Sequence, residues 1–115
     1  MPGIQGQYDQ PKKIYFGSVD TSFVTGDSPI TLDINATLIR NSVDGYIIND
    51  GPGDFTVNLS NDGITFGQDI RLKQAETFSL KSIDIDSIKI TWIADSAYRV
   101  FAVWVITIFL ISNHK

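Results

Sequence analysis

The sequence of 115 residues, with a mass of 12.7 kDa and a formal net charge of -4, has room for one domain with one core. Its balance of 9 Lys+Arg against 13 Asp+Glu disfavours nucleic acid as a partner, because binding nucleic acid requires a basic face. There is no Cys and the single histidine, His114, is penultimate, so a disulfide framework, a cysteine nucleophile and a thiolate or histidine metal site are excluded, and we expect no cofactor and no enzymatic activity.

The composition favours strands over helices. Asp outnumbers Glu by 12 to 1, and Ile, Val and Thr supply 33 β-branched residues against 5 Ala and 6 Leu. Asp is common in turns and β-branched side chains suit pleated strands, so we expect an all-β fold. Residues 1–12 are rich in Gly, Gln and Pro and predict an extended arm without a signal peptide, and hence synthesis in the cytoplasm.

The expected domain covers residues 13–115 and opens with short strands. A first strand begins at Ile14, where Gly17 suggests a bulge, and residues 22–25 suggest a second strand before a turn at 26–29. Residues 30–40 then show the clearest alternation of apolar and polar side chains in the sequence. The apolar positions, which predict a strand with one buried face, are Ile30, Leu32, Ile34, Ala36 and Leu38.

Further strands and turns alternate along the rest of the chain. We expect strands at residues 45–49, 55–60, 70–72, 78–80 and 83–92, and a last long strand after the turn at 94–96. Asn61-Asp62-Gly63 is a preferred hairpin sequence, after which Ile64 and Phe66 are expected to resume the apolar face. Eight to ten short strands without a convincing helix predict an antiparallel β-sandwich, either a jelly roll or immunoglobulin-like.

The C-terminal strand is apolar on both faces from Val100 to Ile111. A helix of these 12 residues would span only about 18 Å, short of the roughly 30 Å core of a bilayer, so a membrane span is disfavoured. As a strand, this segment needs cover on its second face, either from the protein's own chain or from another subunit. In the latter case the predicted subunit interface consists of Phe101, Val103, Val105, Phe109 and Ile111.

Two groups of carboxylates are candidates for chemistry. Asp84 and Asp86 would lie about 7 Å apart on one face of a strand, a separation that suits a glycosidase pair but also two solvated side chains. Asp50, Asp54 and Asp62 sit near turns, where oxygen ligands for calcium could gather, with Asn49 and Asn61 able to supply further oxygens. Their spacing matches no calcium-binding loop, and Asp is also an ordinary turn residue, so we favour the structural interpretation for both groups.

Aromatic side chains could form a platform on which a sugar stacks. The candidates are Tyr15, Tyr46, Trp92, Tyr98 and Trp104. Both tryptophans fall on an apolar parity of their strands, which favours a place in the core instead.

About half of the chain, residues 45–103, carries a pattern that resembles a known group of proteins. The pattern is made up of residues 45–51, of residues 55–66 with the Ser60-Asn61-Asp62-Gly63 hairpin, of Leu72, Glu76, Phe78 and Leu80, and of residues 86–90 and 97–102. It is similar to that of small β-sandwich virion proteins of tailed bacteriophages, such as capsid decoration proteins and head or tail accessory proteins.

The resemblance implies a non-catalytic structural virion protein, assembled in the host cytoplasm. Its expected partners are copies of itself, as a trimer or ring, and capsid or tail proteins, with neither nucleic acid nor a membrane. The alternative function is a carbohydrate-binding or receptor-binding module of a phage tail.

Overall fold

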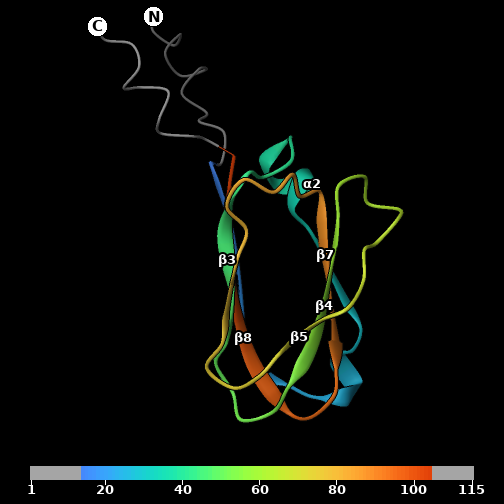
Figure 1. Cartoon of the computed structure of the whole chain (residues 1–115), viewed down its shortest axis with the longest axis vertical. Coiled ribbons are helices and arrows are strands. Elements are labelled where there is room, and N and C mark those ends of the chain that lie inside the picture. Colours follow the sequence, from blue (N-terminus) through green and yellow to red (C-terminus); the bar gives the residue numbers. More distant parts are fainter. Residues whose placement is uncertain (1–13, 105–115) are drawn as a thin grey trace, which may run out of the picture.

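Two sheets that face each other form the fold in the computed structural model, which describes residues 14–104 (Figure 1). The strands are β1 (Tyr15–Phe23), β2 (Ile30–Asp33), β3 (Asp44–Asn49), β4 (Phe55–Ser60), β5 (Ile70–Leu72), β6 (Thr77–Ser79), β7 (Ser87–Trp92) and β8 (Ser96–Val103). One sheet has the order β1-β8-β3-β6 and the other has the order β2-β7-β4-β5. Two short helices, η1 (Thr25–Asp27) and α2 (Ile34–Leu38), connect strands. The predicted all-β antiparallel sandwich is therefore confirmed.

The strand order distinguishes between the two sandwiches that the sequence left open. Four antiparallel pairs are nested within one another: β1 with β8, β2 with β7, β3 with β6, and β4 with β5. This strand order results when one long hairpin is rolled up, so that successive strands of each arm of the hairpin belong alternately to the two sheets. The fold is thus a jelly roll of eight described strands rather than an immunoglobulin-like sandwich.

Side chains that alternate along the strands meet between the sheets and form the core. Its buried apolar members are Phe23, Leu32, Ile34, Leu38, Ile47, Phe55, Val57, Leu72, Leu80, Ile85, Ile88, Ile90, Tyr98, Val100 and Ala102. Phe23, Phe55 and Tyr98 pack edge to face, with ring centroids 5.5 to 6.2 Å apart. Burial raises the pKa of the Tyr98 phenol above its ordinary value.

The prediction of one strand over residues 30–40 is wrong beyond Asp33, where α2 begins. The Asp33 side chain caps this helix by accepting a hydrogen bond from the Ala36 backbone N–H at 3.1 Å. Ile34 and Leu38 are both buried and lie four residues apart, a spacing that places two side chains on the same side of either a strand or a helix. The exposed Ala36 lies between them, away from the core.

Three smaller expectations are also corrected. Residues 22 and 23 complete β1 and Thr25 begins η1, so there is no separate strand over residues 22–25. Pairing between β1 and β8 runs regularly through Gly17, and the irregularity lies between Asp20 and Phe23 instead. Ile64 does not resume the apolar face, because it is 82% exposed in the loop that follows β4.

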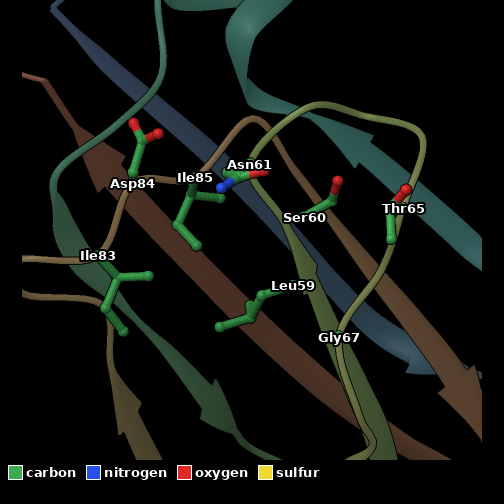
Figure 2. Close-up of a pocket in the computed structure, with 8 residues that line it drawn as sticks. All are labelled: Leu59, Ser60, Asn61, Thr65, Gly67, Ile83, Asp84 and Ile85. Carbon is green, nitrogen blue, oxygen red and sulfur yellow. The ribbon is translucent and has the colours of Figure 1, made fainter.

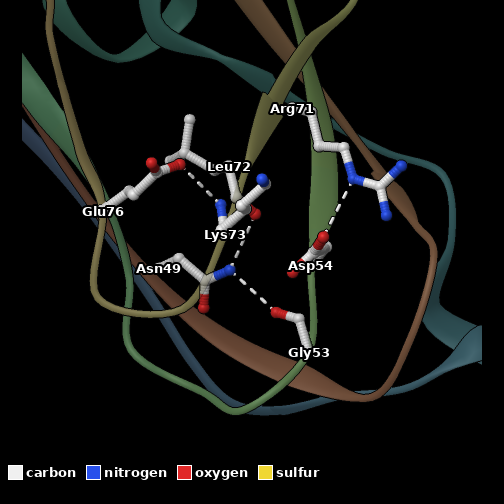
Figure 3. Close-up of polar contacts among 7 residues, drawn as sticks. All are labelled: Asn49, Gly53, Asp54, Arg71, Leu72, Lys73 and Glu76. Atoms are coloured by element: carbon white, nitrogen blue, oxygen red, sulfur yellow. Dashed lines mark hydrogen bonds and ion pairs between the residues drawn. The ribbon is translucent and has the colours of Figure 1, made fainter.

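One buried amide holds together the turns at one end of the sandwich. Asn49 is fully buried, and its Nδ2 donates to the Gly53 carbonyl at 2.8 Å and to the Leu72 carbonyl at 3.0 Å (Figure 3). Its Oδ1 accepts from the Gly51 N–H at 3.0 Å and from Ser96 Oγ at 2.8 Å. All four contacts satisfy the amide, which ties the β3–β4 turn to β5 and to the start of β8.

Candidate interaction surface

The outer faces of the two sheets differ in chemistry. On the sheet β2-β7-β4-β5 the outward positions are mostly polar: Thr31, Thr56, Asn58, Arg71, Lys89 and Thr91. The loop after β4 covers part of this face, since Asn58 Nδ2 donates to the carbonyl of Gly67 at 2.9 Å and to Asp69 Oδ1 at 2.7 Å. Arg71 on this face also forms an ion pair of 2.9 Å with Asp54 (Figure 3). This is the polar outer face expected of a sandwich.

The outer face of the sheet β1-β8-β3-β6 is mainly apolar and aromatic. Its outward side chains on β1, β8 and β3, which we call the aromatic face, are Tyr15, Val19, Asp44, Tyr46, Ile48, Arg99, Phe101 and Val103, and the edge strand β6 adds the exposed Thr77 and Ser79. Val19 is 63% exposed, Tyr15 is 51% exposed and Tyr46 is 36% exposed. Such a run of neighbouring apolar side chains on an outer face indicates an interaction surface more strongly than scattered ones do.

Phe101 lies at the centre of this face, between two tyrosines. In the register, Gly17 of β1 and Tyr46 of β3 stand opposite Phe101 of β8. The ring of Tyr46 stacks on Phe101 with centroids 5.5 Å apart and planes 25° from parallel. Tyr15 stacks on Phe101 at 5.9 Å and 21° from the neighbouring strand β1, where it stands diagonally from Phe101.

Charged groups lie on either side of the aromatic rings. Arg99 donates from Nε to Asp50 Oδ2 at 2.6 Å and from Nη2 to Asp50 Oδ1 at 3.3 Å. These hydrogen bonds, and then the negative charge of Asp50, raise the pKa of Arg99, which therefore stays cationic. Asp44 is exposed at the opposite end of the face and accepts a hydrogen bond from the Gly45 N–H at 2.7 Å.

The structure places part of the predicted subunit interface on this face. Phe101 and Val103 are both half-buried there, on the outer side of β8. Val105, Phe109 and Ile111 lie outside the described residues. The rings of Tyr15 and Tyr46 supply part of the cover that Phe101 requires. Within residues 14–104, no helix is long and apolar enough to cross a membrane.

The sequence alone does not assign Val19 and Ile48 to this face, and it indicates Tyr15 and Tyr46 only as sugar contacts. The period of two in Tyr15, Gly17 and Val19 could have indicated one outward face of β1. That β1, β8 and β3 are adjacent in one sheet depends on the strand order, which the sequence does not reveal.

The other aromatic candidates lie elsewhere. Tyr98 is buried in the core, which excludes it from any platform. Trp92 and Trp104 are half-buried and pack against the core, as expected from their parity. The Trp92 Nε1 donates to Asp95 at 2.9 Å, and the guanidinium of Arg40 lies 4.1 Å from the centroid of the Trp104 ring.

Asp84 and Asp86 do not share a face of a regular strand, contrary to the sequence prediction, because β7 begins only at Ser87. Asp84 accepts a hydrogen bond from Asn41 Nδ2 at 3.2 Å. Asp86 accepts one from Ser87 Oγ at 2.6 Å, so each carboxylate has its own local partner. Ile85, which lies between them, is buried and forms an isolated bridge with Ser42.

The three carboxylates considered for calcium have separate contacts. Asp50 binds Arg99, and Asp54 binds Arg71. Asp62 Oδ1 accepts from the backbone N–H groups of Ile64 and Thr65, both at 2.8 Å. In the part of the chain that the structure describes, no three acidic or histidine side chains gather as a metal site would require.

A hollow of about 300 Å³ lies beside the loop after β4 (Figure 2). Its lining consists of Leu59, Ser60, Asn61, Thr65, Gly67, Ile83, Asp84 and Ile85. Asn41 Nδ2 links two parts of the rim, since it donates to the Asn61 carbonyl at 3.0 Å as well as to Asp84. The lining mixes polar and apolar side chains and has one titratable group, Asp84, so the hollow contains no acid–base pair.

Comparison with known proteins does not identify a family. No model of a known protein family matches the chain, and no curated protein matches it. A solved structure described as "Crystal structure of PirA" aligns over 82% of this chain and 96% of its own, with a TM-score of 0.43 and 12% sequence identity. A likeness at this level carries no argument about function.

Proposed function

We propose that this chain is a non-catalytic structural subunit that assembles through the outer face of the sheet β1-β8-β3-β6. The observation that carries the proposal is the exposure of Tyr15, Val19 and Tyr46 around Phe101, on one outer face but not on the other. Burying each such side chain against a partner contributes on the order of 1.5–3 kcal/mol of transfer free energy. This gain offsets the cost of association only when several side chains are buried together.

The kind of assembly follows from the sequence resemblance. Residues 45–103 resemble small virion proteins of tailed bacteriophages, and subunits repeated within one assembly can be held by modest contacts that act together. A subunit with one apolar outer face and no paired catalytic groups among residues 14–104 suits such a role. A jelly roll by itself does not decide the function, because capsid domains and lectin domains both use it.

Carbohydrate binding through the three rings is the second candidate. A sugar stacks on the flat face of an aromatic ring, as other π-face partners do. Phe101 is stacked on both of its faces by Tyr15 and Tyr46, which leaves it little flat surface for a sugar. Phe101 itself is therefore a poor platform for a sugar, and the exposed rings of Tyr15 and Tyr46 are the ones that this alternative would use.

The test measures the oligomeric state of the full chain by native mass spectrometry and light scattering over a range of concentrations. We expect oligomers at tens of micromolar and their loss in Val19→Lys, which places a charge on the aromatic face at an exposed edge-strand position. The matched control is Thr31→Lys, an exposed β-branched residue on the edge strand β2 of the other sheet, which should assemble like the wild type.

A wild-type chain that stays monomeric at these concentrations would contradict the assembly role. Binding of that monomer on a glycan array, abolished by Tyr46→Ser, would support the carbohydrate alternative instead. The virion assignment has its own test in the genes beside this one: neighbouring capsid and portal genes support it, and neighbouring metabolic genes contradict it.

A further inference from the structure

We propose that the occupant of the aromatic face is the same face of a second copy, related by a two-fold axis that runs across the strands at Phe101. This inference rests on the proposed assembly function and adds its partner and symmetry. The two copies would pack sheet on sheet with antiparallel strands, about 10 Å apart. The aromatic side chains around Phe101 in one copy then face the same side chains in the other copy, at the axis. The charged side chains on either side of Phe101 in one copy face those of the other copy.

The spacing of charges about Phe101 is balanced. Arg99 precedes Phe101 by two residues on β8, which is about 7 Å along the strand. Asp44 of β3 pairs with Val103, which follows Phe101 by two residues, so Asp44 lies about 7 Å from the Phe101 row in the opposite direction. A two-fold axis through that row exchanges the two ends. Arg99 of each copy is thereby brought to the level of Asp44 of the other.

Both charged groups have capacity for this contact. Arg99 uses Nε and Nη2 for Asp50, and its Nη1 has no hydrogen-bond partner among residues 14–104. The guanidinium can therefore bind a second carboxylate without releasing the first. Asp44 has no ion pair within the same residues and contacts only the Gly45 N–H through its side chain. After the rotation the two groups lie one strand apart sideways, about 5 Å, across sheets about 10 Å apart, so their backbones are about 11 Å apart and the two side chains can span the gap together.

The area of the face agrees with a partner of this kind. The strands β1, β8, β3 and β6 have 9, 8, 6 and 3 residues, so at about 3.3 Å per residue and about 4.8 Å between strands the sheet presents roughly 400 Å² on one face. Two such faces together bury roughly 800 Å², the size of a weak, transient interface. We therefore expect a dimer with a micromolar dissociation constant, whose specificity depends on the two symmetric Arg99–Asp44 contacts.

The test uses two variants of the full chain with opposite charge changes, Arg99→Glu and Asp44→Lys. Each variant alone faces a like charge across both symmetric contacts, so its dissociation constant should rise by roughly tenfold or more. Mixed in equal amounts, the two variants restore opposite charges at both contacts. Native mass spectrometry should then show mainly the mixed dimer. A role of either residue within its own subunit alone would not produce this recovery.

The control is Arg71→Glu, which removes the corresponding arginine from an ion pair on the other sheet and should leave dimerisation unchanged. Circular dichroism checks that every variant folds. Wild-type dimers with no weakening in the single variants, or weakened variants whose mixture forms no mixed dimer, would overturn the two-fold contact and leave the assembly function standing. A wild-type chain that remains monomeric would overturn both.

Discussion

At the scale of single residues, the amide of Asn49 is the most demanding polar group of the core. Its Nδ2 donates to two carbonyls, those of Gly53 and Leu72, in a fully buried position. Asn49→Asp keeps the shape but replaces the donor with an acceptor that faces both carbonyls. We expect it to lower the free energy of unfolding by about 2–4 kcal/mol at neutral pH.

Urea denaturation of the two proteins measures this difference. The matched control is Asn61→Asp, the same chemical change at an exposed position, which should alter stability by less than about 0.5 kcal/mol. Equal effects at both positions would mean that the buried hydrogen bonds of Asn49 contribute nothing beyond the added charge.

Asp62 sets the pH dependence of the loop after β4. Hydrogen bonds from the N–H groups of Thr65 and Ile64, and then from Ser60 Oγ, lower the pKa of Asp62 below its ordinary value of 3.8. A depressed pKa in the folded state gives stability that is present above pH 3.8 and is lost as the pH falls through the folded value.

We therefore expect the amide resonances of Ile64 and Thr65 to shift together in an NMR titration, with a midpoint below 3.8. In Asp62→Asn the same resonances should no longer respond over this range. A midpoint at or above 3.8 in the wild type would show that these hydrogen bonds are absent in solution.

At the scale of elements, regular strands are predictable from the sequence and departures from regularity are not. The strands β3 and β4 follow the expected residues 45–49 and 55–60 closely, because alternation and turn sequences define them on both sides. Over residues 34–38 the sequence predicts a strand, because the spacing of Ile34 and Leu38 fits the period of a strand as well as that of a helix. The cap from Asp33 favours the helix, which ends at Ile39 in the left-handed region (φ 68°), a conformation that a β-branched residue rarely adopts and that the sequence therefore does not indicate.

The candidate surface shows the same limit. Phe101 and Val103 are predictable from the two apolar faces of the C-terminal strand, which is a property of one segment. Tyr15 and Tyr46 lie beside them only because β1 and β3 pair with β8 in this register. The periodicity of one segment does not reveal which distant strand pairs with it.

Gly45 is the point at which the pairing of β3 with β8 depends most on a missing side chain. Its φ is +143°, and a Cβ there would lie 2.0 Å from the Phe101 carbonyl oxygen. We expect Gly45→Ala to destabilise the fold by about 3 kcal/mol or more, since the backbone of β8 must move. Gly17→Ala is the control, because a Cβ at Gly17 meets nothing within 4 Å.

Thermal unfolding of the two variants separates these effects. Gly17→Ala should unfold at about the wild-type temperature, and Gly45→Ala well below it. Similar losses in both variants would attribute the cost to glycine flexibility in general, which is worth only about 0.5–1 kcal/mol.

At the scale of the whole molecule, the jelly roll divides the outer surface between two chemistries. The nested pairing places β8 inside one sheet, between β1 and β3, where its outer face adjoins two further strands. A strand with two apolar faces thereby becomes the centre of an exposed sheet face. The other sheet presents threonines and the Arg71–Asp54 ion pair on its outer side.

If the aromatic face binds a second copy, the stability of the protein depends on its concentration. Only folded chains associate, so at a concentration about tenfold above the dissociation constant, binding adds about 1.4 kcal/mol to the free energy of unfolding. For a domain of this size that raises Tm by about 5 °C. Differential scanning calorimetry at increasing dilution should show Tm falling for the wild type and for Thr31→Lys. Val19→Lys should unfold at one temperature throughout, and a wild-type Tm that does not change with dilution would mean that the face has no partner in solution.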